Sequence, residues 1–144
     1  MVYRLTRRTH DLFQTDSNRF TLELLKSVQE SYGPNAPEKL LYNMFERKTD
    51  ALKSKTKGET VAERAKWLAR LRDSEGYMAQ FIMEEKEDGS QILECHSPIM
   101  NLLDRYPIIG RLEQDMFEAV LGTSVRREET RNSGLFECAF YFAA

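Results

Sequence analysis

The chain has 144 residues, about the length of one domain. Its 21 Lys and Arg against 23 Asp and Glu give a formal net charge of −2, which excludes a generally basic nucleic-acid binder. Hydrophobic residues make up 41% and charged residues 31% of the chain, a composition typical of globular rather than disordered proteins. No apolar run approaches the roughly 20 residues of a membrane helix and no signal-peptide pattern follows Met1, so we expect a cytoplasmic protein without a membrane partner.

The first part of the chain predicts helices. A short basic stretch precedes Ser17, which is a suitable cap for a helix with apolar residues at helical spacing. That helix is expected to end at Tyr32-Gly33-Pro34, because glycine suits the position after a helix and proline cannot continue one. Pro37 then suits the first turn of a second amphipathic helix, which Gly58 interrupts.

A third helix is predicted with defined ends. Thr60 and Glu63 form a T-x-x-E capping box at its start, and Gly76 closes it. Arg70 and Arg72 fall near its end, where positive charge complements the helix dipole.

The second part of the chain predicts a β-β-α-β-β unit. Two extended segments, Tyr77–Glu84 and Gln91–His96, flank an acidic turn with the hairpin signal Asp88-Gly89. Two further strands are expected at Ser124–Arg131 and Leu135–Phe142. The predicted fold class is therefore α+β, with N-terminal helices followed by a four-stranded antiparallel sheet.

Two helices are expected between the strand pairs. Ser97-Pro98 is a plausible cap and first turn for a short helix that ends near Arg105, before Pro107. A longer helix follows, with Gly122 as its C-cap.

Catalytic and metal motifs are absent from the sequence. No GxSxG, HExxH, GxxxxGK[ST] or GxGxxG occurs, and there are only two histidines, His10 and His96. Two cysteines, Cys95 and Cys138, are too few for a disulfide framework or for a four-thiolate metal site in one chain. We therefore expect a protein that is not an enzyme.

Several short segments occur in an order that resembles the regulatory half of the SufR family, whose members are winged-helix repressors that sense iron–sulfur clusters and control cluster-assembly genes. The segments are Phe45–Lys48, Val61–Arg64, Glu75–Ala79, Tyr106-Pro107, Glu113–Phe117, Val125–Arg127 and Gly134–Cys138. In addition, Tyr3–Thr6 resembles the last strand of that family's winged helix. The resemblance implies three regions: a remnant of the wing and linker (1–16), a helical dimerisation region (17–75) and an α+β sensor region (76–144).

The resemblance also implies partners. DNA would be contacted only through a winged-helix domain that this chain lacks, because reading a major groove needs an inserted helix or ribbon. Two DNA readers at fixed spacing require a dimer, so we expect a homodimer built largely on Ser17–Asp73. The apolar stripes of three helices beside one small sheet are the expected contact.

The cluster ligands implied by the resemblance are largely replaced. The family has cysteines at the positions of Ser97, Gly110 and Cys138, and only the last is kept. Serine is a poor substitute for a thiolate and glycine has no side chain.

Two residues near Ser97 leave alternatives open. Cys95 shares one face of an extended segment with Ser97, so Cys95 and Cys138 from two chains would supply four thiolates, enough in number for one shared iron–sulfur cluster. Alternatively, both cysteines are small core residues and no cofactor binds. His96 is either a metal ligand beside Cys95 or a half-exposed residue on the other strand face.

A second hypothesis is a stand-alone sensor similar to the 4-vinyl-reductase type of binding domain. In that case an apolar or tetrapyrrole-like ligand would lie in a pocket between helices and sheet. The aromatic residues expected to line this pocket, if they do not simply form the core, are Trp67, Tyr77, Phe81, Phe136 and Phe140.

Overall fold

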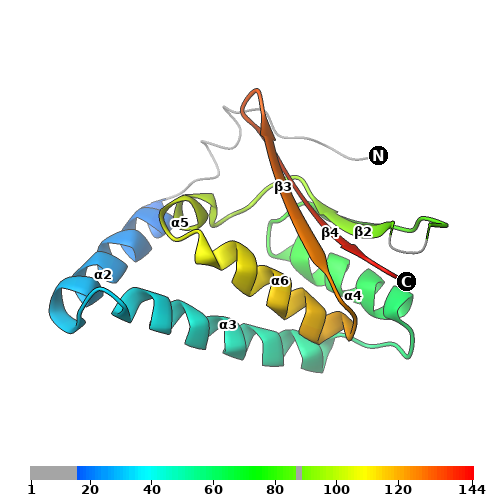
Figure 1. The fold of residues 1–144 in the computed structure, drawn as a ribbon, viewed down its shortest axis with the longest axis horizontal. Coiled ribbons are helices and arrows are strands. Elements are labelled where there is room, and N and C mark those ends of the chain that lie inside the picture. Colours follow the sequence, from blue (N-terminus) through cyan, green and yellow to red (C-terminus); the bar gives the residue numbers. More distant parts are fainter. Residues whose placement is uncertain (1–15, 87–88) are drawn as a thin grey trace.

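The computed structural model describes residues 16–86 and 89–144 (Figure 1). Helices come first, followed by a sheet whose two strand pairs are separated by two more helices. This confirms the predicted α+β class with a four-stranded antiparallel sheet. The expected wing remnant before Asp16, with His10, and Asp88 of the expected hairpin turn lie outside the described residues.

The three N-terminal helices begin and end close to the residues predicted to start and stop them. They are α2 (Asp16–Tyr32), α3 (Ala36–Lys55) and α4 (Val61–Ser74). The turn after α2 places Gly33 at a φ of 105°, a conformation that glycine adopts without steric cost. The capping box at the start of α4 is confirmed, since the Glu63 N–H donates to the Thr60 hydroxyl over 3.1 Å.

The sheet has the spatial order β1-β2-β4-β3, and every neighbouring pair is antiparallel. Its strands are β1 (Ala79–Ile82), β2 (Ser90–Glu94), β3 (Arg126–Asn132) and β4 (Leu135–Phe142). β1 is shorter than predicted at both ends. At its start, Met78 has a φ of 50°, so the extended conformation begins only at Ala79. The central strands β2 and β4 present alternate residues to the core, as a sheet covered on one face requires.

Two helices lie between the strand pairs, as predicted: α5 (Met100–Arg105) and α6 (Ile108–Leu121). Gly122 ends α6 in the left-handed conformation, with a φ of 75°. The predicted Ser97 cap of α5 is wrong. Ile99 precedes the helix, and the buried Ser97 hydroxyl has no hydrogen-bond partner within the described ranges.

One hydrophobic core joins the helices to the sheet. In Figure 1, α6 lies between α3 and the sheet, while α2 extends to the end of the molecule opposite the sheet. The Phe117 ring of α6 stacks on Phe140 of β4 with centroids 3.7 Å apart, and both side chains are fully buried. The helical and sheet regions therefore share a single interior rather than forming separate cores.

Candidate functional site

The most unusual feature of the core is a fully buried arginine. Arg72, near the end of α4, donates from Nε and Nη2 to both carboxylate oxygens of Glu94 on β2, over 2.6 and 2.8 Å. Its Nη2 also donates to Glu113 of α6 over 2.7 Å. One guanidinium therefore bridges two buried carboxylates and connects α4, β2 and α6.

An aromatic ring completes the surroundings of Arg72. Its guanidinium carbon lies 3.4 Å from the centroid of the Tyr77 ring, in a cation–π arrangement. Burial raises the pKa of the Tyr77 phenol, so this ring stays neutral at physiological pH.

The charges continue from the core to the surface as an alternating chain. Arg127 of β3 donates to Glu113 over 3.2 Å and to Glu129 over 3.0 Å. Arg131 then bridges Glu129 and Asp104, which is partly exposed on α5. We call this set the charge network; in order, its members are Glu94, Arg72, Glu113, Arg127, Glu129, Arg131 and Asp104.

Sequence reasoning missed this network, although a signal was present. Arg72 follows Ala65, Leu68 and Ala69 at helical spacing, so it falls on the core face of α4 rather than in solvent. Glu113 likewise lies within the apolar stripe of α6. When two helices carry residues of opposite charge at core positions, these residues are predicted to form an ion pair, because an unpaired buried charge is costly.

Burial controls the protonation of the innermost carboxylate. It raises the pKa of Glu94 from 4.5 to about 7, and the charge of Glu113 acts in the same direction. Arg72 opposes this shift by attraction and hydrogen bonding. Glu94 therefore exchanges its proton close to neutral pH, inside the core.

Cys138, which the resemblance predicted as a cluster ligand, lies inside the charge network. The strand register pairs it with Glu94 on one side and with Glu129 on the other, so the three side chains share a face of the sheet. Burial is the main influence on the Cys138 thiol and raises its pKa well above the ordinary value, against the attraction of Arg127. In the absence of a bound metal, Cys138 is therefore a protonated thiol.

The other predicted ligands do not join Cys138. Cys95 follows Glu94 directly, but β2 ends at Glu94 and Cys95 lies in the bend after it. The extended segment that was predicted to align Cys95 with Ser97 is therefore not formed. His96 is buried rather than half-exposed, and Ser97 is buried as well. Across residues 16–86 and 89–144, no three His, Cys, Asp or Glu side chains lie close enough to hold a metal ion.

The space beside Gly110, where the resemblance implies a second cluster ligand, is occupied by Arg127 of β3. A Cβ at Gly110 on α6 would lie 2.9 Å from Nη1 of Arg127. A cysteine side chain there would displace the guanidinium that binds Glu113 and Glu129.

These residues do not fit an iron–sulfur cluster. Thiolate ligands are required, and the Cys95 and Cys138 side chains are both fully buried within the single chain, out of reach of a second chain. Cluster binding stays a prediction that this arrangement of thiols does not support.

The aromatic residues of the expected ligand pocket are distributed differently. Phe136 and Phe140 are buried in the core, and Tyr77 is covered by Arg72. The Trp67 side chain is 37% exposed on α4, with Lys57 and Arg70 each 5.9 Å from its ring. Trp67 therefore lies at the surface, apart from the buried rings with which it was expected to line a pocket.

The chain matches no family model, and neither the curated proteins nor the solved structures include one with significant similarity to it. Within the described residues, no helix has the length and apolar character needed to cross a bilayer.

Proposed function

We propose that this chain is the regulatory pairing domain of a SufR-like transcription regulator, a non-enzymatic cytoplasmic homodimer. The observation that carries the proposal is the concentration of exposed apolar side chains on α2 and α3. Six of the eight large hydrophobic residues exposed in the described part of the chain belong to these two helices: Phe20, Leu24, Tyr32, Leu40, Tyr42 and Met44.

The strongest part of this surface is on α2. Phe20 and Leu24 are one helical turn apart and have 68% and 54% of their surface exposed. Leu40 and Met44 repeat the same spacing on α3. We call these four residues the apolar face. Clustered apolar side chains on a surface are characteristic of interaction sites.

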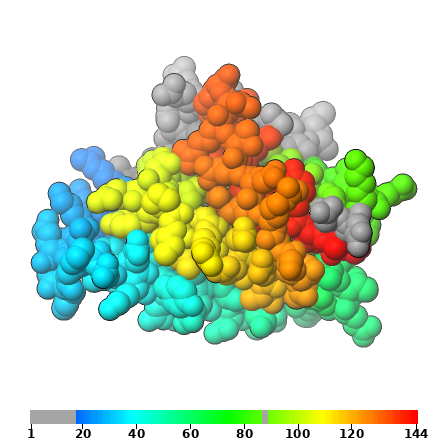
Figure 2. Space-filling view, viewed as in Figure 1, coloured from blue at the N-terminus to red at the C-terminus, as the bar shows by residue number. Residues whose placement is uncertain are grey.

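A second copy of the chain is the partner that suits this surface. A twofold interface uses the same patch on both subunits, so its charges must complement themselves. The face meets this condition, since the exposed Arg19 and Glu23 beside it form an ion pair of opposite charges one turn apart. Figure 2 also shows α2 at the rim of the molecule, with no other described element over its outer side in that view.

Pairing through α2 and α3 is what a dimeric repressor would need, because two DNA readers must be held at fixed spacing. Reading DNA would be the task of a separate winged-helix domain. The charge network gives a route by which a change at the sheet would reach the pairing helices, since Arg72 joins α4 to β2 and α6, and α6 packs on α3.

The test is the mass of the protein in solution. Light scattering coupled to size-exclusion chromatography at micromolar concentration should give the mass of a dimer for the wild type. The double variant Phe20→Glu/Leu24→Glu should give the mass of a monomer, because four carboxylates would then meet at the interface.

Met83→Glu is the matched control, because Met83 is equally exposed but lies beyond β1, away from the apolar face. This variant should remain dimeric. A monomeric wild type, or a double variant that still dimerises, would overturn the proposal.

A further inference from the structure

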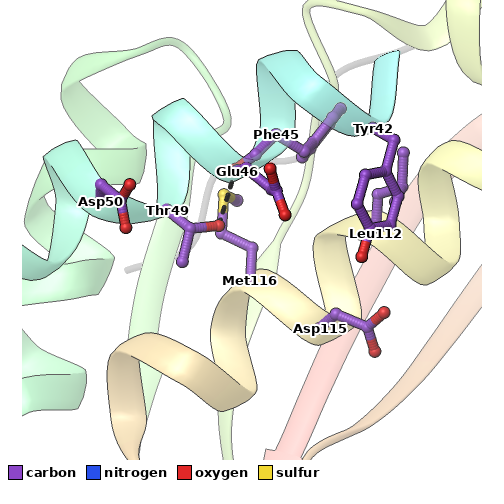
Figure 3. Close-up of a pocket in the computed structure, with 8 residues that line it drawn as sticks. All are labelled: Tyr42, Phe45, Glu46, Thr49, Asp50, Leu112, Asp115 and Met116. Carbon is purple, nitrogen blue, oxygen red and sulfur yellow. Dashed lines mark hydrogen bonds between the residues drawn. The ribbon is translucent and has the colours of Figure 1, made fainter. Parts of the chain in front are cut away.

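A groove lies between α3 and α6, on the side of α3 that faces the sheet region (Figure 3). Its volume is about 320 Å³, enough for a small organic molecule. The floor consists of the core side chains Phe45, Leu112 and Met116. A ligand in this groove would therefore contact an apolar surface from below.

The rim of the groove has the opposite character. Glu46 and Asp50 of α3 and Asp115 of α6 contribute three carboxylates. None of the described residues that line the groove is Lys or Arg. Glu46 and Asp115 come from opposite helices, so negative charge flanks the groove on both sides (Figure 3).

An aromatic ring stands at one end of the groove. Tyr42 extends from α3 toward α6 beside Leu112, and more than half of its surface is exposed (Figure 3). The face of an aromatic ring attracts cations, and ammonium groups are commonly recognised by aromatic rings. The ring and the carboxylates thus favour the same sign of ligand charge.

We propose that this groove binds a small organic cation, an ammonium or guanidinium group carried on an apolar body. An anion would meet three like charges, and a neutral apolar molecule would desolvate carboxylates without compensating them. A bare metal ion is disfavoured, because the described acidic residues do not converge on one point. A cation with an apolar body can pack its apolar part on the floor while its charge interacts with the carboxylates of the rim and with the Tyr42 ring.

The test uses benzyltrimethylammonium as the probe, with benzyl alcohol as the neutral analogue and phenylacetate as the anionic one. Each is titrated into the isotopically labelled full chain while amide shifts are followed by NMR. The ammonium should shift the amides of residues around the groove saturably, and the two analogues should not. Equal shifts with phenylacetate or benzyl alcohol, or no saturable shift with the ammonium, would overturn the proposal.

Variants separate the contributions of charge and ring. Glu46→Gln and Asp115→Asn should each weaken binding about twofold to fivefold, as expected for exposed charge pairs. Tyr42→Leu keeps the apolar surface but removes the ring, and should weaken binding about threefold. Glu38→Gln, an exposed acid in the first turn of α3 outside the groove, is the control and should bind like the wild type. Wild-type affinity in all three groove variants would contradict the assignment.

This inference is independent of the pairing proposal. The groove residues other than Tyr42 are not exposed apolar residues, and none belongs to the apolar face. The monomerising variant Phe20→Glu/Leu24→Glu should therefore bind the ammonium as the wild type does. Loss of binding in that variant would show that the groove needs the dimer, and would overturn the assignment to a single chain.

Discussion

Arg72 is the buried counter-charge of two carboxylates, Glu94 and Glu113. Taking a charge out of water is expensive, and a buried ion pair is stable only when its members are fully hydrogen-bonded. Arg72 meets this condition through Glu94, Glu113 and the Tyr77 ring. Its removal would leave two carboxylates without their main counter-charge in the core.

We therefore expect Arg72→Met to lower the free energy of unfolding by about 3 to 5 kcal/mol, the usual effect of removing one partner from a buried ion pair. Urea denaturation followed by circular dichroism measures this change. Arg70→Met is the control, since Arg70 is exposed on the same helix, and it should change stability by less than about 0.5 kcal/mol. Equal effects of the two substitutions would argue against the role of Arg72.

The raised pKa of Glu94 predicts a pH effect with a definite sign. The folded state holds this proton up to about pH 7, whereas the unfolded chain releases it near 4.5. The contribution of Glu94 to stability is therefore complete below about pH 4.5 and is lost as the pH rises to about 7, with a slope approaching 1 kcal/mol per pH unit.

Comparison with Glu94→Gln isolates this contribution, because the amide does not titrate. The wild-type free energy of unfolding minus that of Glu94→Gln should decrease between pH 5 and about pH 7 and level off above it. Glu128→Gln, which removes a half-exposed carboxylate, is the control, and the decrease should be specific to Glu94. A Glu94 difference that rises with pH would reverse the predicted sign.

At the scale of single elements, the capping box at the start of α4 is expected to stabilise the protein. The Thr60 hydroxyl accepts from the Glu63 N–H, and the Glu63 carboxylate accepts in turn from the N–H groups of Glu59 and Thr60. We expect Thr60→Ala to destabilise the protein by about 1 kcal/mol, as loss of an N-cap generally does.

Thermal unfolding monitored at 222 nm in the far ultraviolet, the helical signal, provides the measurement. Ser54→Ala is a suitable control, because its exposed hydroxyl donates to the Ala51 carbonyl of its own helix. If Thr60→Ala unfolds at the wild-type temperature, the capping box contributes no stability.

The helices were predictable because their end signals are local. Gly33, Gly122 and the Thr60–Glu63 box each depend on residues within one turn, so the sequence contains the whole interaction. The start of β1 is different. Met78 leaves the extended conformation just before this strand, and the sequence around it has no local signal for that change.

The candidate site was less predictable, because its residues come from five separate elements. Arg72 and Glu113 are 41 positions apart and meet only when α4 and α6 close on the sheet. The sequence predicts that Cys95 and Ser97 share one face of an extended segment. β2 instead ends at Glu94, which pairs with Cys138, and the point at which a strand ends is decided by tertiary contacts.

At the scale of the whole molecule, the apolar face and the shared core have different consequences for unfolding. The core joins α3, α4 and α6 to the sheet, so a single chain should unfold as one cooperative unit. The apolar face contributes only when two chains meet. Its contribution to stability should therefore depend on protein concentration, unlike that of the core.

We accordingly expect the wild-type melting temperature to rise as the protein concentration increases, because mass action favours the folded dimer. Phe20→Glu/Leu24→Glu should remove this dependence, while Met83→Glu should keep it. Differential scanning calorimetry over a hundredfold range of concentration measures the shift. Since Phe20 and Leu24 are exposed in the single chain, the double variant should still unfold cooperatively. A melting temperature that is independent of concentration in the wild type would mean that α2 and α3 do not join two folded chains.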